Sequence, residues 1–284
     1  MQTVIGLGQA GCNIAEYLKR YPEYECFKFD SGLKRTKSTY GIKEQFSSEA
    51  YEAKFPKLRS FLKTPRPETL FITSCGKVTG AALKILQHIK DSTSVTLMYI
   101  IPDPSSLNSV QKKQNNLFFN VFQEYARSGL FEKVILVDNK KVSTIVGPAP
   151  MLKYWELVNE AIASTYHMIN VFSHSKPVFT TLSDRIETAR ITTQGLITSE
   201  ESEESEEKCF FSLDIPREKR YYYAIPQKML EEDDMLMTKI QKQVKNGIEH
   251  DKMKVGFSVY ETSYESPIVY CESYSTLIQK KSAF

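Results

Sequence analysis

Short runs of β-branched and aromatic residues alternate along the chain with longer segments in which apolar residues recur every three or four positions. Side chains repeat every two residues along a strand and about every 3.6 residues along a helix, so the runs predict strands and the segments predict helices. A strand followed directly by a helix is predicted within residues 4–18, further strands at 25–30, 69–74, 94–102 and 133–138, and further helices at 51–62, 80–92 and 117–129.

This alternation predicts the fold class of the first half of the chain. Strands that alternate with helices of this length are typical of βαβ units, and consecutive βαβ units build a mostly parallel sheet. In such sheets ligands bind at the carboxyl ends of the strands. We therefore predict a Rossmann-like α/β domain over residues 1–149 with its binding loops at that edge.

The pattern changes after residue 149, where a long helix is predicted over residues 150–172. Its apolar stripe consists of Leu152, Trp155, Val158, Ile162, Ile169 and Phe172. Residues 173–284 then predict a smaller α+β domain with strands at 219–226, 254–261 and 267–275 and a helix near 229–249. The acidic stretch 199–208 has no apolar residue before Cys209, and charge repulsion favours a solvated loop there.

Composition narrows the class of protein. A chain of 284 residues with 41% hydrophobic residues can bury two medium-sized cores. The net charge of +3 arises from nearly balanced acidic and basic residues, so we expect neither nucleic acid nor a membrane as a partner. The five cysteines are scattered without a CxxC pair, and no run of about 18 apolar residues occurs, which favours a cytoplasmic protein.

The first candidate site is Gly6-x-Gly8-x-x-Gly11, which lies between the first strand and its helix. This spacing is the dinucleotide fingerprint, because it brings backbone N–H groups of a helix N-terminus to a phosphate, and Asp30 lies where a ribose-binding acid is expected. Two simpler interpretations stay open: the glycines permit close packing, and Asp30 caps a turn.

Four further places converge on the same predicted edge. The segment 71–86 is a second strand, glycine turn and helix start, which an NAD-binding domain does not need. The loop 100–109 is rich in Pro and Ser. Asn139 ends a strand, and Trp155 and Asn159 lie four apart on one helix face, where a ring and an amide can meet a base. The alternatives are a core tryptophan and surface or turn asparagines.

Taken in order, these segments resemble the tubulin/FtsZ superfamily of filament-forming GTPases. GQAGCNI (8–14) resembles its first nucleotide loop, FITSCGKVTGAAL (71–83) its signature glycine loop and PDPSSLNS (102–109) its ribose loop. VDNKKV and WELVNEA are similar to the segments that recognise guanine, and residues 254–275 to the closing strand pair of the second domain.

The resemblance implies a GTPase-type domain that binds GTP or GDP, accompanied by Mg²⁺, and a protein that stacks head to tail on copies of itself. The residues that match the family's nucleotide site are Gly8, Gln9, Ala10, Gly11, Cys12, Asn13, Asp30, Cys75, Gly76, Lys77, Thr79, Gly80, Pro102, Asp103, Asn139, Trp155 and Asn159.

Two departures from the family pattern affect this interpretation. The signature loop has Lys77 and Val78 where the family has glycines, although a lysine can meet phosphate by charge. The family's catalytic acids follow the central helix, and here residues 170–179 contain no Asp or Glu, which predicts slow or absent hydrolysis. His174 is the one titratable substitute; Cys75, His88, His167 and His250 are expected to be structural.

Three hypotheses remain at this stage. The first is a GTP-binding, filament-forming protein with weak or no hydrolysis. The second is a degenerate scaffold that keeps the fold and acts through an unidentified protein partner, which the missing acids favour. The third is an NAD(P)-dependent oxidoreductase, supported only by Gly6, Gly8, Gly11 and Asp30.

Overall fold

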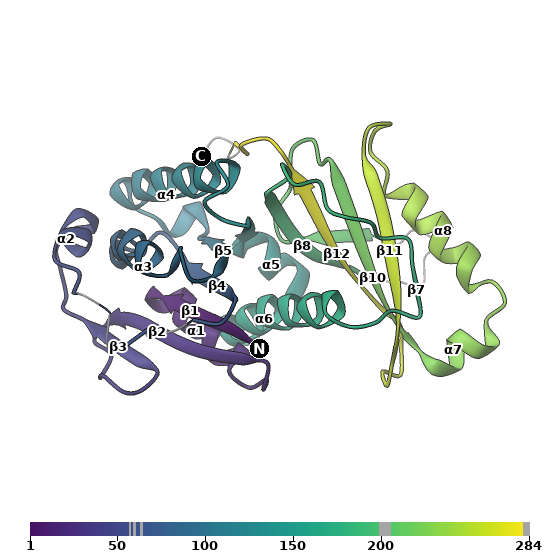
Figure 1. The fold of residues 1–284 in the computed structure, drawn as a ribbon, viewed down its shortest axis with the longest axis horizontal. Helices are drawn as coiled ribbons and strands as arrows, with labels where there is room; N and C mark the ends of the chain where they lie inside the picture. Colours follow the sequence, from purple (N-terminus) through teal and green to yellow (C-terminus); the bar gives the residue numbers. More distant parts are fainter. Residues whose placement is uncertain (57, 59–60, 63–64, 199–205, 281–284) are drawn as a thin grey trace. The chain divides into compact units, whose positions relative to one another are not determined.

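The computed structural model describes residues 1–56, 58, 61–62, 65–198 and 206–280. The chain divides into two compact units, residues 1–163 together with Lys280, and residues Ser164–Gln279 (Figure 1). The long helix α6 (Tyr154–Ser173) begins in unit 1 and ends in unit 2. None of the helices in the described part of the chain is long and apolar enough to cross a membrane.

Unit 1 is built on a parallel sheet with the strand order β3-β2-β1-β4-β5-β6. Its strands are β1 (Gln2–Leu7), β2 (Tyr24–Ser31), β3 (Thr39–Ile42), β4 (Glu68–Thr73), β5 (Ser94–Ile101) and β6 (Lys133–Asp138). Successive residues of β1 are all buried, so both faces of the sheet are covered, as expected for βαβ units.

The helices of unit 1 connect these strands. They are α1 (Gly8–Leu18), α2 (Ser48–Ala53), the 3₁₀ helix η1 (Lys77–Ala81), α3 (Ala82–Ile89), the 3₁₀ helix η2 (Pro104–Ser106), α4 (Ser109–Arg127) and α5 (Asn139–Val146). The sequence pattern missed β3 and α5, and it placed the helix of the segment 51–62 several residues late, since α2 is capped by Ser47. The α/β class with a mostly parallel sheet is confirmed.

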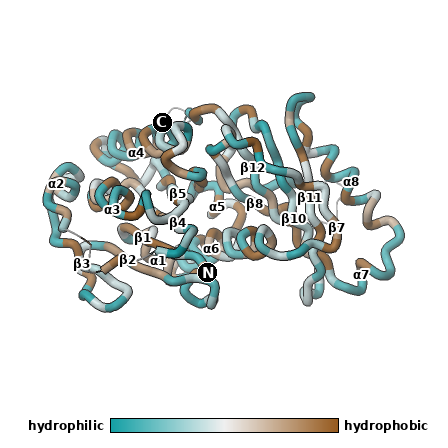
Figure 2. Tube along the Cα trace, viewed as in Figure 1, coloured by the Kyte–Doolittle hydropathy of each residue, from teal (hydrophilic) through white to brown (hydrophobic). Residues whose placement is uncertain are grey.

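Unit 2 contains a mixed sheet with the order β8-β12-β10-β11-β7, and β9 pairs with β8. Its elements are β7 (Phe179–Thr180), β8 (Ile191–Thr198), β9 (Glu206–Cys209), β10 (Glu218–Pro226), α7 (Gln227–Glu232), α8 (Leu236–Asn246), β11 (Lys254–Thr262) and β12 (Ile268–Ser275). Figure 2 shows both hydrophilic and hydrophobic residues along these strands and mainly hydrophilic residues in the outer loops.

Alternation along β10 assigns its side chains to two cores. Tyr221, Tyr223 and Ile225 pack with Ile240 of α8, whereas Tyr222 and Ala224 pack on the other face with residues from the end of α6. Both sets are buried, which explains why YYYAI reads as a continuous apolar run.

The acidic stretch differs in part from the expected loop. Residues 199–205 lie outside the described residues, but 206–208 belong to β9. Glu207 is drawn into the sheet because Lys219 and Tyr221 hydrogen-bond its carboxylate. The predicted helix near 229–249 is two helices, α7 and α8, separated at Asp233, whose side chain accepts from the Met235 N–H.

Candidate functional site

The carboxyl ends of the parallel strands of unit 1 lie at one edge of its sheet. Leu7 pairs with Phe29, Thr73 with Tyr99 and Ile101 with Asp138, so the loops that leave β1, β2, β4, β5 and β6 begin side by side. Every predicted site residue except those of α6 follows one of these strand ends or, in the case of Asp30, lies at the end of its strand. The structure therefore brings the predicted loops to the same edge of the sheet.

The first loop is the junction between β1 and α1, where the helix begins at Gly8 directly after Leu7. Gly8 has a φ of +75°, a conformation that favours glycine. No side chain caps this end of α1, so the N–H groups of its first turn are not satisfied by a side-chain cap and suit an anion. The side chains of Gln9 and Asn13 are exposed there, and Ala10 is half-buried.

Close packing explains two glycines of this motif, Gly6 and Gly11. A Cβ on Gly11 would overlap the carbonyl oxygen of Ile72, and one on Gly6 would overlap that of Gly11. Cys12 points into the fold, where its Sγ donates to the Gly6 and Phe29 carbonyls at 3.5 Å. Burial raises the pKa of this thiol to about 12, so it stays protonated and is not a nucleophile.

The second loop, which leads from β4 into η1, contacts the junction between β1 and α1. A Cβ on Gly8 would lie 2.9 Å from Cγ1 of Val78, which places the η1 loop against the N-terminus of α1. Gly76 and Lys77 are exposed at the start of η1, and no side chain caps that end either. Two uncapped helix starts and one lysine therefore line the same part of the edge.

The remaining residues of the second loop serve the fold. The Thr79 hydroxyl donates to the Ser74 carbonyl at 2.6 Å, and a Cβ on Gly80 would overlap the carbonyl oxygen of Ser48 in α2. Cys75 is buried. Thr79 and Gly80, which were predicted to belong to the nucleotide site, are both buried, and α2 packs closely on η1 at Gly80.

The loops that leave β5 and β6 lie next to each other. Asp103 caps η2 by accepting from the Ser105 N–H at 2.9 Å, and this hydrogen bond is the main cause of its lowered pKa, with a smaller contribution from the nearby Lys140. Asp138 caps α5 by accepting from the Lys140 N–H at 2.9 Å, while burial raises its pKa. Pro102 and Asn139, which flank these caps, are half-buried.

Asp138 and Lys140 also belong to this edge, although neither was predicted as a site residue. An Asp at a strand end that is followed by a helical pattern is an N-cap signal, and that signal would have found both α5 and the turn that holds Asn139. Asp30, at the end of β2, makes a similar turn by accepting from the Ser31 N–H at 2.8 Å, and burial raises its pKa.

Helix α6 presents a ring and a buried amide near its start. Trp155 is 55% exposed and packs edge-on against Tyr154, whereas Asn159 is 9% exposed. Leu152 precedes the helix and is 96% exposed. Only Val158, Ile162, Ile169 and Phe172 of the predicted stripe are buried, so the interpretation of Trp155 as a core residue does not hold.

No family model matches the sequence, and no curated protein sequence matches it. The structure is similar to a GTPγS-form protofilament of TubZ from Bacillus thuringiensis serovar israelensis, with a TM-score of 0.75 and 17% identity over 96% of this chain and 86% of that one. The chain has the tubulin/FtsZ fold.

Two other solved structures with the tubulin/FtsZ fold match to a similar extent. CetZ2 from Haloferax volcanii, a GTPγS-bound protofilament, gives a TM-score of 0.69 at 15% identity over 96% of this chain and 92% of that one. An empty FtsZ dimer from M. jannaschii gives 0.68 at 11% identity over 96% and 87%. The resemblance inferred from the order of the motifs is thus confirmed for the fold.

The segment that follows α6 holds the catalytic acids in the tubulin/FtsZ superfamily, as the resemblance implied. Here α6 ends at Ser173, and the exposed residues after it include His174. The Nδ1 atom of His174 lies 2.8 Å from the Asn170 carbonyl oxygen, which orients the ring against its own helix. No carboxylate occurs between residues 170 and 179.

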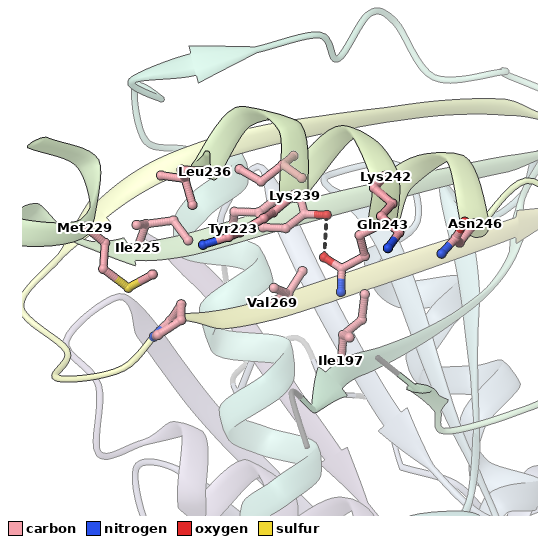
Figure 3. A pocket seen from close by; sticks show the side chains of 12 residues that line it. Ile197, Tyr223, Ile225, Met229, Leu236, Lys239, Lys242, Gln243, Asn246 and Val269 are labelled. Atoms are coloured by element: carbon pink, nitrogen blue, oxygen red, sulfur yellow. Dashed lines mark hydrogen bonds between the residues drawn. The ribbon is translucent and has the colours of Figure 1, made fainter. Parts of the chain in front are cut away.

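Unit 2 also has an apolar cavity of about 490 Å³ between its sheet and helices α7 and α8 (Figure 3). In Figure 3 the side chains of Ile197 and Val269 point toward it from the sheet, and the Tyr223 hydroxyl donates to Oε1 of Gln243 in α8. Most of its lining residues are apolar, and Lys239, Lys242, Gln243 and Asn246 of α8 supply the polar part. It lies in unit 2, whereas the candidate nucleotide residues belong to unit 1.

Proposed function

We propose that the protein binds a guanine nucleotide at the carboxyl edge of the unit 1 sheet and assembles head to tail into a tubulin-like filament. The observation that carries this proposal is the meeting of two uncapped helix starts, where Gly8 of α1 contacts Val78 of the η1 loop. Such paired N-termini suit the oxygens of a di- or triphosphate.

The phosphates would be held mainly by backbone N–H groups and by charge. The first turn of α1 supplies N–H groups beside Gly8, Gln9 and Ala10, and Lys77 supplies the positive charge that replaces a glycine-lined loop. Mg²⁺ would enter with the phosphates, since this ion keeps most of its waters and needs few protein ligands.

The base and sugar would lie along the later loops. Trp155 offers an exposed ring for stacking, and Asn159 and Asn139 offer amides that can donate and accept at a base edge. Pro102 and Asp103 would border the ribose, and the preformed turn at Asp103 fixes that loop before the ligand arrives.

Filament formation is supported by the kind of structure that this fold matches. The TubZ structures are protofilaments in GTPγS and GDP forms, and helical models of TubZ filaments match over 96 to 97% of this chain. A head-to-tail contact of this kind joins two different surfaces and does not close, so it extends into a filament. Hydrolysis is expected to be slow, because residues 170–179 offer only His174 to orient water.

The degenerate scaffold stays as the second candidate because Lys77 and Val78 replace glycines and the acidic loop is missing. The structure removes part of the support for an oxidoreductase. Close packing of α1 against β1 and β4 accounts for Gly6 and Gly11, which were two of its four supporting residues.

The experiment is a light-scattering and pelleting assay with GTP and Mg²⁺, compared with ATP, NAD and no nucleotide. Lys77→Glu should raise the Kd for GTP at least tenfold, whereas Lys84→Glu, the same charge change on an exposed position of α3, should leave it unchanged. Equal affinities of the two variants would remove Lys77 from the site. No binding of GTP by the wild-type chain would favour the scaffold.

A further inference from the structure

A row of polar side chains crosses one face of the unit 2 sheet. Tyr221, Cys271, Gly195 and Cys209 pair directly with one another across β10, β12, β8 and β9, and residues in direct register share a face. Gly195 has no side chain, so the thiols on either side of it can approach each other above its backbone. Lys219, Ser273 and Thr193 form the next row on the same face.

Cys209 and Cys271 of this row and Glu207, two residues before Cys209 on β9, place donor atoms close together. A carboxylate oxygen of Glu207 and the Sγ atoms of Cys209 and Cys271 all lie within 4.8 Å of one another. Cys209 donates to Oε1 of Glu207 at 3.3 Å, and Cys209 and Cys271 are themselves hydrogen-bonded. The cluster is therefore a chain of weak thiol hydrogen bonds that ends on a carboxylate.

The second oxygen of Glu207 is held from the opposite side. Oε2 accepts from the Lys219 ammonium and from the Tyr221 hydroxyl, both at 3.1 Å, and Lys219 also pairs with Glu249 at 2.9 Å. Only Oε1 faces the thiols. Partners that fix one carboxylate oxygen while the other faces a ligand position are the usual outer shell of a metal-binding carboxylate.

A cavity of about 260 Å³ opens beside the cluster and is lined by Glu207, Cys209, Lys219 and Ser273, among others. Ser273 is 3% exposed, and its hydroxyl has no hydrogen-bond partner among the described residues. A buried hydroxyl normally costs free energy unless water or a ligand satisfies it. The cavity therefore has both the room and the polar lining for a water molecule next to Cys209.

We propose that Glu207, Cys209 and Cys271 bind a thiophilic divalent cation of the zinc class, with a solvent molecule from the cavity as the fourth ligand. On binding, two S–H bonds break, two metal–sulfur bonds form and two protons leave. The two thiolates and the carboxylate bring three negative charges; Zn²⁺ balances two of them, and Lys219, which Glu207 shares with Glu249, lies against the third. This inference concerns unit 2 and does not depend on the nucleotide site.

The distances fit such a centre after a small adjustment. Metal–sulfur bonds of about 2.3 Å in a tetrahedron place the sulfur atoms about 3.7 Å apart. The donor atoms here lie within 4.8 Å, so side-chain rotations of roughly an ångström bring them together.

The positions of Cys209 and Cys271 suit a metal site better than a disulfide bond. β9 and β12 lie on opposite sides of β8, so their Cα atoms are about 9.5 Å apart, at roughly 4.8 Å per strand spacing. Cysteines whose Cα atoms are more than about 7 Å apart cannot be bridged without backbone movement. Metal binding needs no such movement.

The test is titration of the reduced full-length chain with Zn²⁺, and with Co²⁺ as a spectroscopic probe. We expect one Zn²⁺ per chain, a cobalt–thiolate charge-transfer band, and a binding heat that varies with the ionisation enthalpy of the buffer. Cys209→Ser and Cys271→Ser should each lose the band and weaken Zn²⁺ binding at least a hundredfold. Cys26→Ser, a buried cysteine of unit 1, is the matched control and should keep both.

Circular dichroism separates loss of ligand from loss of fold. Because Cys271 is fully buried, its variant is paired with Glu207→Gln and with the half-buried Cys209→Ser, which should fold and still lose the metal. No zinc uptake by the wild-type chain would overturn the proposal. So would uptake that both cysteine variants retain, or a Cys209–Cys271 disulfide that forms readily under mild oxidation.

Discussion

The sheets of the two units bury different kinds of side chain. In unit 1 the central strands β4, β5 and β6 bury mainly aliphatic residues, and the polar groups of interest begin where each strand ends. In unit 2 the strands themselves bury Glu218, Lys219 and Glu272. The first sheet is thus a scaffold for loops at its edge, and the second sheet carries polar groups on its own faces.

The contrast has a physical consequence. A buried charge is tolerated only if hydrogen bonds replace its hydration, so each acid in the unit 2 sheet must be surrounded by donors. Glu272 accepts from Gln194 at 3.0 Å, Tyr222 at 3.3 Å and Tyr274 at 2.6 Å. Tyrosines in these strands therefore act as donors to buried carboxylates as well as filling the core.

The largest expected effect is the removal of one such acid. Glu272→Ala leaves Gln194, Tyr222 and Tyr274 without their shared acceptor, and we expect a loss of about 3 kcal/mol or more in the free energy of unfolding. Urea unfolding followed by circular dichroism measures it. Glu261→Ala, on an exposed position of β11, is the control and should change stability by less than about 0.5 kcal/mol. Similar losses in both variants would show that the network around Glu272 is not stabilising.

The same contrast explains how much the sequence could predict. The apolar strands of unit 1 alternate with helical patterns along the chain, so the sequence located five of the six strands and the edge where the loops meet. In β8, however, ITTQGLIT hides buried Thr192, Thr193 and Gln194 in a pattern that reads as a partly exposed segment, and this strand was missed.

The cluster of Glu207, Cys209 and Cys271 could not be predicted for a related reason. Cys271 is more than sixty residues from Cys209, and the two meet only because both pair with Gly195. Single-sequence patterns carry no information on such register. Likewise, Trp155 looked like part of an apolar stripe, and only the structure shows that the stripe is buried from Val158 onward.

The second prediction tests the edge of the unit 1 sheet as a packing site. Gly11→Ala would place a Cβ on the Ile72 carbonyl oxygen, and such overpacking should cost about 2 to 3 kcal/mol. Gly76→Ala is the matched control, because its Cβ would lie 3.9 Å from Val78 in ordinary contact. Differential scanning calorimetry should show a lower melting temperature only for Gly11→Ala. An unchanged Gly11→Ala would mean that α1 does not pack closely on β4.

The third prediction concerns ligand binding and not folding. Trp155→Ala should weaken GTP binding by the stacking contribution, on the order of 1 to 3 kcal/mol. Stability should hardly change, because the ring is 55% exposed. Isothermal titration calorimetry gives the Kd, and Leu152→Ala, which removes another exposed apolar side chain close by, should leave it unaltered. Equal Kd values for wild type and Trp155→Ala would place the base elsewhere.

The smallest effect is expected at Asp30, where burial raises the pKa of a carboxylate above its ordinary value. A raised folded-state pKa means that the folded protein holds the proton more tightly, so this group contributes stability below its unfolded pKa and loses it as the pH rises through the folded value. Asp30→Asn keeps an acceptor for the Ser31 N–H without the charge. The variant should therefore be more stable than wild type at neutral pH, by less than about 1 kcal/mol for a half-buried group, and the difference should shrink as the pH is lowered toward 4. Urea unfolding at several pH values measures both trends, and a variant that is less stable at neutral pH would indicate that a positive partner stabilises the Asp30 charge.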